Sequence, residues 1–156
     1  MSKKRALGQH FLIDQNIARK IVQIAEIKPD ETVLEIGPGR GILTRHLIQQ
    51  AKQVIAIEVD RDLYGPLEKE FCDASGLSLV HGDALEYPYE SITGSFKVVA
   101  NLPYSITTPL LFRLLELKDK ISSMTLMLQK EVADRIVAKP DSKTYGRLSV
   151  TVQLYA

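Results

Sequence analysis

The stretch TVLEIGPGRG, residues 32–41, decides the fold of this 156-residue chain. Its first half is apolar apart from one acid and one threonine, which is typical of a strand buried in a sheet. Its second half carries three glycines at alternate positions: Gly37, Gly39 and Gly41. Glycine lacks a Cβ, so the backbone can turn tightly and a ligand can approach it closely. The stretch therefore predicts a strand, a binding loop for an adenosine-type cofactor, and then a helix.

The rest of the chain alternates between strand-like and helix-like hydrophobic patterns. Further strands are predicted at residues 53–59, 77–82, 96–101, 123–129 and 147–156. Helices are predicted at residues 14–27, 43–48, 63–71, 106–118 and 130–139. Apolar strands joined by helical crossovers predict an α/β fold, in which a mostly parallel twisted sheet carries helices on both faces. No repeat interrupts the pattern, and we expect one domain over residues 1–156.

Several local details refine these elements. Asp14 is predicted to cap the first helix. Pro66 is compatible with its helix only within the first turn. Thr107 or Thr108, followed by Pro109, is predicted to start the next-to-last helix. The predicted final strand has no partner after it, which suggests a chain that ends before its domain is complete.

The composition limits the class of protein. The formal net charge is +1, so attraction to nucleic acid would come from local basic clusters. Two clusters are present, and both also fit ordinary solvated surface: Lys3, Lys4, Arg5; and Lys130, Arg135, Lys139, Lys143, Arg147. The lone Cys72 argues against a disulfide framework or a zinc site, and it fits the cytoplasm. We expect no metal, no signal peptide and no membrane span.

Polar residues follow the other predicted strands. Glu58 lies 21 residues after Gly37, the spacing at which an acid accepts hydrogen bonds from ribose hydroxyls. Asp83 would receive an adenine amino group, although alone it also fits a turn former or helix cap. Asn101 ends the fourth strand and begins the sequence NLPY. Four consecutive strand ends therefore meet at one edge of the predicted sheet.

These residues resemble those of the Rossmann-like S-adenosylmethionine-dependent methyltransferases. NLPY is similar to the signature of enzymes that methylate exocyclic amines of nucleobases. More narrowly, three segments look like the KsgA (RsmA) family of rRNA adenine dimethyltransferases: GQHFL (8–12), NLPYSITTPLLF (101–112) and QKEVADRIVAKPDSKTYGRLSV (129–150). The resemblance covers essentially the whole chain.

The family implies a function. It implies dimethylation of N6 of two adjacent adenosines in the 3′-terminal hairpin of small-subunit (16S) rRNA, in immature small ribosomal subunits. S-adenosylmethionine would be converted to S-adenosylhomocysteine, by a cytoplasmic monomer. The family continues with another strand, a proline-rich segment and a small helical domain, so the resemblance implies that this chain is the N-terminal catalytic part.

The resemblance also assigns the cofactor contacts: His10, Leu12, Gly37, Gly39, Glu58, Asp83 and Asn101. Residues 1–13 would fold over the cofactor. Gly37 would approach the methionine part, Glu58 the ribose and Asp83 the adenine. Asn101 would face both the cofactor and the target base.

The chemistry of NLPY can be argued from its residues. The Asn101 side-chain oxygen and the Leu102 carbonyl would accept the N6 hydrogens, localise the nitrogen lone pair and stabilise its developing charge. Pro103 would keep Leu102 extended. Tyr104 would stack on the base, which must leave its helical stack to be reached. These four residues are the predicted catalytic residues.

Three alternatives remain open at this point. A nicotinamide-dependent dehydrogenase shares the glycine loop and Glu58, but it expects the spacing GxGxxG and gives NLPY no role. An Erm-type methyltransferase would modify large-subunit rRNA. A fragment that binds RNA or assists ribosome assembly without catalysis would keep the pocket unused.

Overall fold

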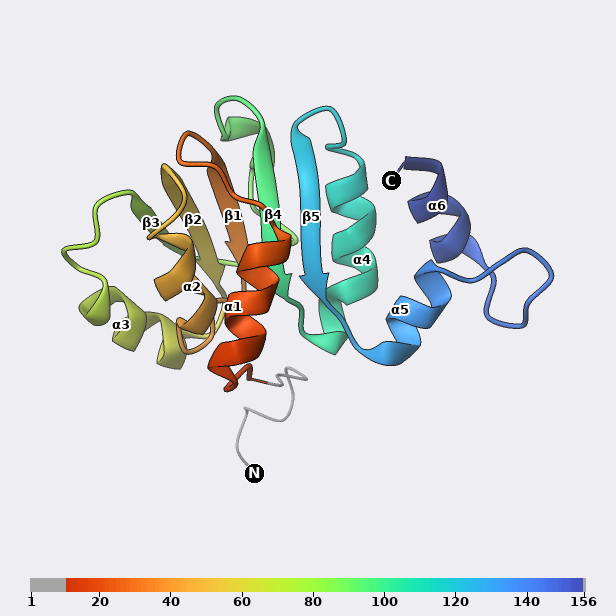
Figure 1. The fold of residues 1–156 in the computed structure, drawn as a ribbon, viewed down its shortest axis with the longest axis horizontal. Coiled ribbons are helices and arrows are strands. Elements are labelled where there is room, and N and C mark those ends of the chain that lie inside the picture. The colour runs from red at the N-terminus through yellow and green to blue at the C-terminus, as the bar shows by residue number, and fades with distance from the viewer. Residues whose placement is uncertain (1–10, 156) are drawn as a thin grey trace.

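The computed structural model describes residues 11–155, which fold around a five-stranded sheet (Figure 1). The elements in chain order are α1 (Gln15–Ile24), β1 (Thr32–Ile36), α2 (Ile42–Leu47), β2 (Gln53–Glu58), α3 (Arg61–Glu70), β3 (Leu77–His81), the 3₁₀ helix η2 (Tyr89–Ser91), β4 (Phe96–Asn101), α4 (Tyr104–Leu115), β5 (Ile121–Met127), α5 (Lys130–Ile136) and α6 (Arg147–Tyr155). The strands lie in the order β3-β2-β1-β4-β5, and every neighbouring pair is parallel.

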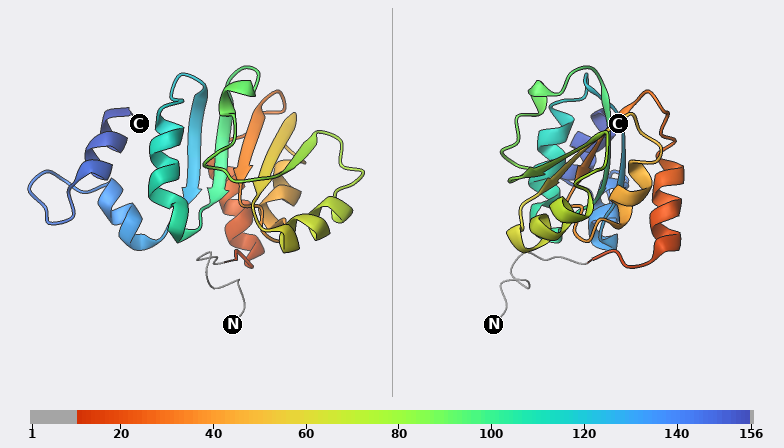
Figure 2. Two further views of the ribbon diagram at one scale, coloured as in Figure 1. Left: turned by 180° about the vertical axis from the view of Figure 1, so that it is seen from behind. Right: turned by 90° about the vertical axis from the view of Figure 1, so that its left-hand side faces the viewer.

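Helices cover both faces of this sheet (Figure 2). Helices α1 and α2 pack on one face in a cluster that includes Val33 of β1, while α4 and η2 pack on the other face with Leu34 and Ile36. Successive side chains of a strand point to opposite faces, so a central strand must be apolar on both. The predicted α/β fold with helices on both faces is confirmed.

The sheet order places a ligand site between β1 and β4. The chain runs outward from β1 through β2 to β3, and then returns to the other side of β1 as β4. In open parallel sheets, the carboxyl ends of strands at such a reversal form a crevice where ligands bind. The loop after β1 contains Gly37, and the end of β4 carries Asn101.

The prediction of a final strand at residues 147–156 was wrong, because α6 occupies this segment. Leu148 and Val152 lie one helical turn apart and pack in a small cluster with α4 and α5. Polar side chains of α6 also bind the last carbonyls of α5. Ser149 donates to the Arg135 carbonyl, and Gln153 Nε2 lies 2.8 Å from the Ile136 oxygen. Helical geometry is required for these contacts, and a strand would lose them.

The starts of the helices were predicted with mixed success. Asp14 caps α1 as expected, and its Oδ1 accepts a bond of 2.7 Å from the amide of Asn16. However, α4 begins at Tyr104 rather than near Thr107, so Pro109 lies inside it. Pro66 likewise lies beyond the first turn of α3. Each proline removes one helical hydrogen bond, and buried leucines next to both prolines hold these helices against the core.

At the amino edge of the sheet, a buried lysine holds the end of α1. Lys97 Nζ donates to the carbonyl oxygens of Ala25 at 3.0 Å and Glu26 at 2.7 Å. It also pairs with Glu31 Oε2 at 3.1 Å. The Lys28 amide donates to this same Glu31 oxygen, and together with Lys97 it keeps the pKa of Glu31 below its usual value.

Replacing Lys97 by methionine is expected to lower the free energy of unfolding by about 3 kcal/mol, because two carbonyls and a carboxylate lose a buried cationic partner. Urea denaturation measures the change. Lys20→Met is the control, since Lys20 is an exposed lysine on α1 and should change stability by less than about 0.5 kcal/mol. Equal stability of the two variants would contradict this role of Lys97.

Candidate active site

A pocket opens at the carboxyl ends of the first four strands. Its lining includes these residues from the sequence prediction: Leu12, Gly37, Gly39, Glu58, Asp83, Asn101 and Pro103. His10 lies outside the described residues. The structure therefore brings the predicted strand-end residues together around one cavity, while their contacts with a cofactor stay predictions.

The two glycines of the loop serve different purposes. Gly37 has φ +68°, and the atom nearest to a Cβ built there is the Asn101 carbonyl oxygen, 4.0 Å away. A side chain at Gly37 would enter the space between β1 and β4. Gly39 has φ +59°, and its Cβ would lie 3.3 Å from Phe11 Cδ1. The absence of a side chain at Gly39 therefore lets the Phe11 ring pack against the loop, whereas its absence at Gly37 leaves the pocket open.

Glu58 is a buried acid that braces the glycine loop. Its side chain is 2% exposed. Oε2 accepts a bond of 3.0 Å from the Gly39 amide, and Oε1 accepts one of 2.9 Å from the Asp60 amide. Burial raises the pKa of Glu58, and these backbone donors oppose the rise. Each carboxylate oxygen can accept a second hydrogen bond, so Glu58 can brace the loop and still bind a hydroxyl.

Asp83 forms a turn and also lines the pocket, while its predicted contact with adenine stays a prediction. Its Oδ1 accepts a bond of 2.8 Å from the Leu85 amide, which is the geometry of a turn former. Asp83 is exposed and also lines the pocket. The turn fixes where the carboxylate stands after β3.

The NLPY segment forms a corner between β4 and α4. The Leu102 amide donates to the Met127 carbonyl at 3.2 Å, which extends the pairing with β5. Pro103 is the N-cap of α4, with φ −63° and ψ 139°. The Thr107 hydroxyl donates to its carbonyl at 2.8 Å. Tyr104 is the first helical residue and is 53% exposed. The corner is thus fixed on both sides, and the Tyr104 ring remains accessible.

A second groove adjoins the pocket. It is lined by Phe11, Leu12, Ile13, Asp14, Ile17, Asn101, Leu102, Met127, Leu128 and Gln129. Phe11, Leu12 and Asn101 line both cavities, so they separate one from the other. Phe11 had no predicted role of its own, although it lies between His10 and Leu12, which were predicted to contact the cofactor. The end of β5 was not predicted to line a site, because nothing in SMTLMLQ suggests one.

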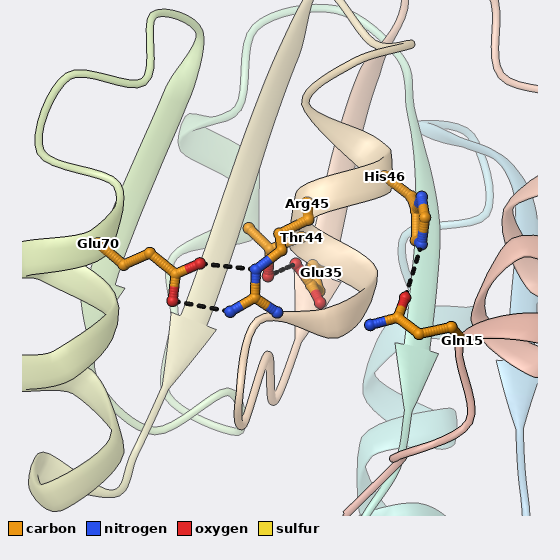
Figure 3. Close-up of polar contacts among 6 residues, drawn as sticks. All are labelled: Gln15, Glu35, Thr44, Arg45, His46 and Glu70. Carbon is orange, nitrogen blue, oxygen red and sulfur yellow. Dashed lines mark hydrogen bonds and ion pairs between the residues drawn. The ribbon is translucent and has the colours of Figure 1, made fainter.

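Below the glycine loop lies a buried acid that the sequence analysis gave no role. Glu35 is 1% exposed, and its Oε2 accepts a bond of 2.7 Å from the Thr44 hydroxyl (Figure 3). Its Oε1 is buried and has no hydrogen-bond partner within the described part of the chain. Burial raises the pKa of Glu35 to about 8, the Thr44 bond opposes this, and the charge of Glu58 adds to the rise. Burial therefore favours the protonated form of Glu35.

The helix after the loop is held from three sides. Besides the bond from Thr44 to β1, Arg45 forms two bonds to Glu70 of α3, at 2.6 and 2.8 Å. His46 Nε2 lies 3.1 Å from Gln15 Oε1 of α1 (Figure 3). These successive side chains of α2 fix the position of the glycine loop that precedes it.

Within residues 11–155, no group of three or more histidine, cysteine or acidic side chains is arranged to hold a metal ion. In the same part of the chain, no helix is both long and apolar enough to cross a membrane.

Comparison with known proteins gives a consistent result. The family model for ribosomal RNA adenine dimethylase matches residues 1–156. Ribosomal RNA small subunit methyltransferase A of Clostridium botulinum is 47% identical over 152 residues, which cover 96% of this chain and 55% of that protein. The chain thus spans about half the length of the curated relatives it matches.

Two solved structures are similar over most of the chain. A dimethyladenosine transferase from Plasmodium falciparum has a TM-score of 0.83 and 35% identity, over 93% of this chain and 52% of that one. The 23S rRNA methyltransferase ErmE has a TM-score of 0.75 and 34% identity, over 81% of this chain and 50% of that one. The predicted Rossmann-like methyltransferase fold is confirmed.

Proposed function

We propose the function of this chain from the premise that it belongs to the ribosomal RNA adenine dimethylase family. It is the catalytic part of an S-adenosylmethionine-dependent enzyme that dimethylates N6 of two adjacent adenosines in the 3′-terminal hairpin of 16S rRNA. The observation that carries the proposal is the position of Asn101, which lines both the strand-end pocket and the adjoining groove. One residue can therefore contact a methyl donor and its acceptor.

The strand-end pocket suits S-adenosylmethionine, which when bound supplies an electrophilic methyl group on a sulfonium. The open space in front of Gly37 admits the methionine part. The Glu58 carboxylate would accept hydrogen bonds from the ribose hydroxyls, and the Asp83 carboxylate would accept one from the adenine amino group. The product, S-adenosylhomocysteine, would keep the same contacts.

The residues at the end of β4 activate the nucleophile. An adenine N6 lone pair is delocalised into the ring. The Asn101 amide oxygen and the Leu102 carbonyl accept the N6 hydrogens and favour a pyramidal nitrogen, whose developing positive charge they stabilise. Tyr104, exposed at the start of α4, stacks on the extruded base. Alignment of the nitrogen with the methyl group then supplies much of the acceleration.

The adjoining groove belongs to the RNA side of the reaction. Most of its lining is apolar, and it includes Met127 and Leu128 near the end of β5 and Ile13 and Ile17 near the start of α1. Such a surface suits an unstacked base rather than a duplex. We assign small-subunit RNA because the curated relatives are named for it. The chain would act as a monomer on immature small subunits in the cytoplasm.

Calorimetric titration with S-adenosylmethionine tests the proposal, followed by methyl transfer to immature small subunits. Glu58→Gln is expected to weaken cofactor affinity at least about tenfold, since a charged acceptor of two hydroxyls is lost. Glu116→Gln, an exposed acid on the C-terminal end of α4, is the control. Absence of cofactor binding would contradict the enzyme proposal. Transfer to large-subunit rRNA instead would favour the Erm-type alternative.

A further inference from the structure

We propose that Arg40 binds the α-carboxylate of S-adenosylmethionine, and that the ring of Phe11 holds the Arg40 guanidinium in position. The inference rests on the proposed function and adds two residues to the cofactor site. It concerns the amino-acid end of the cofactor, which Gly37 is predicted to approach.

Arg40 stands where that end of the cofactor would lie. It lies between Gly39 and Gly41 in the glycine loop and is the only cationic residue among those of the described chain that line the pocket. In the proposed function, Glu58 at the end of β2 and Asp83 after β3 receive the nucleoside, and Glu58 meets the glycine loop at Gly39. The amino-acid end then lies beside Gly37 and Arg40. A carboxylate that leaves water needs donors there, and a guanidinium offers two parallel N–H bonds.

Phe11 positions the guanidinium. Arg40 Cζ lies 5.0 Å from the centroid of the Phe11 ring, which is the geometry of a cation–π contact. The ring itself rests on Gly39, since its Cδ1 lies 3.3 Å from the position of the missing Cβ. A guanidinium stacked by its face still presents its N–H edge. Phe11 thus orients Arg40 without occupying its hydrogen-bond donors.

In the described part of the chain, no acidic side chain is paired with Arg40. Within residues 11–155, the ion pairs are those of Arg45, Lys97 and Lys130, and none involves Arg40. The contrast with Arg45 is useful, because Arg45 lies 5.9 Å from the Phe71 ring and also pairs with Glu70 at 2.6 Å. Arg45 contacts both an aromatic ring and a carboxylate of the protein. Arg40 contacts an aromatic ring and lines the pocket, where the proposed ligand would supply the carboxylate.

The test compares two ligands by calorimetric titration. S-adenosylhomocysteine carries the amino-acid end, and 5′-methylthioadenosine has the same nucleoside and sulfur but lacks it. Arg40→Ala is expected to weaken S-adenosylhomocysteine binding about tenfold, the typical loss for a charge-assisted hydrogen bond at an accessible site. Binding of 5′-methylthioadenosine should stay unchanged. Arg40→Lys should retain part of the preference for S-adenosylhomocysteine over 5′-methylthioadenosine, because lysine keeps the positive charge but lacks the two parallel N–H donors.

Two further variants test whether Phe11 acts by positioning Arg40 or only by supporting the structure of the loop. Arg19→Ala removes an exposed arginine of α1 that does not line the pocket, and it should leave the ratio of the two affinities unchanged. Phe11→Leu keeps an apolar contact with Gly39 but removes the aromatic face. It should weaken S-adenosylhomocysteine binding by about threefold when Arg40 is present, consistent with an exposed cation–π contact. It should have no further effect on the ratio in the Arg40→Ala background.

The outcomes are distinguishable. Equal losses for both ligands would mean that Arg40 only shapes the loop, and unchanged affinities would mean that it makes no contact; either result overturns the inference and leaves the proposed function standing. If the parent chain bound neither ligand, the proposed function would fall together with the inference.

Discussion

Replacing Asn101 by alanine is expected to lower the rate of methyl transfer by at least about a hundredfold, the usual cost of removing one preorganised acceptor or donor at a reacting centre. The cofactor affinity should fall only a few fold, because Gly37, Glu58 and Asp83 are untouched. The amide oxygen of Asn101 is the side-chain acceptor we assign to the N6 hydrogens. Its loss leaves the nitrogen lone pair delocalised while the methyl donor stays bound. Single-turnover methylation of immature small subunits, paired with calorimetric titration, measures both quantities.

The matched control is Asn16→Ala, which removes an exposed asparagine from α1. It should leave both quantities unchanged. Asn101→Asp retains an oxygen acceptor and should keep more activity than the alanine variant. If Asn101→Ala reduced cofactor affinity and transfer rate by the same factor, Asn101 would serve the cofactor alone, and its role at the N6 amine would be contradicted.

The sheet and the ends of its strands could be predicted because their signals are local. Each central strand is a short apolar run between turn-forming residues, and parallel strands bring their carboxyl ends to one edge. Glu58, Asp83 and Asn101 needed no knowledge of the helices to be placed there. Their hydrogen bonds were less predictable, since the Glu58 contact with Gly39 joins the end of β2 to the loop after β1.

The final helix could not be predicted from its own residues. The segment RLSVTVQLY places apolar residues at alternate positions, which fits a strand, but Leu148 and Val152 also fit one face of a helix. Contacts with α5 favour the helix over the strand, because Ser149 and Gln153 donate hydrogen bonds to carbonyl oxygens at the end of α5 and just after it. These contacts depend on tertiary structure, which overrides a local pattern.

The start of α4 and the residues around the glycine loop were missed for related reasons. Threonine followed by proline is a common helix start, yet Thr107 instead bonds the Pro103 carbonyl from within the first turn. Phe11 and Arg40 are far apart in sequence, and their contact exists only because the segment before α1 crosses the loop. Glu35 was assigned no role because its hydrogen-bond partner, Thr44, lies on a helix, and the local sequence of the strand does not reveal that contact.

Replacing Glu35 by glutamine is expected to make the protein increasingly more stable than the parent as the pH rises from about 5 to about 8. Glu35 is fully buried, and its pKa is raised from 4.5 to about 8. In the unfolded chain the carboxyl ionises near pH 4.5, whereas in the folded chain it stays protonated until about pH 8. The folded state therefore binds more protons in this range, and the parent loses stability as pH rises through it. The full shift corresponds to about 5 kcal/mol.

Urea denaturation at pH values from 5 to 9 measures this effect. Glutamine mimics the protonated acid and can still accept a hydrogen bond from the Thr44 hydroxyl, so the variant should be similar to the parent near pH 5. It should be increasingly more stable up to about pH 8, and the difference should then level off. The buried acid Glu58 shifts in the same direction, so a smaller decline with pH should remain in the variant. Glu70→Gln removes an exposed acid and should shift stability by less than about 1 kcal/mol. If the Glu35→Gln curve ran parallel to that of the parent, Glu35 would be ionised in the folded protein, and the protonated acid beneath the glycine loop would be ruled out.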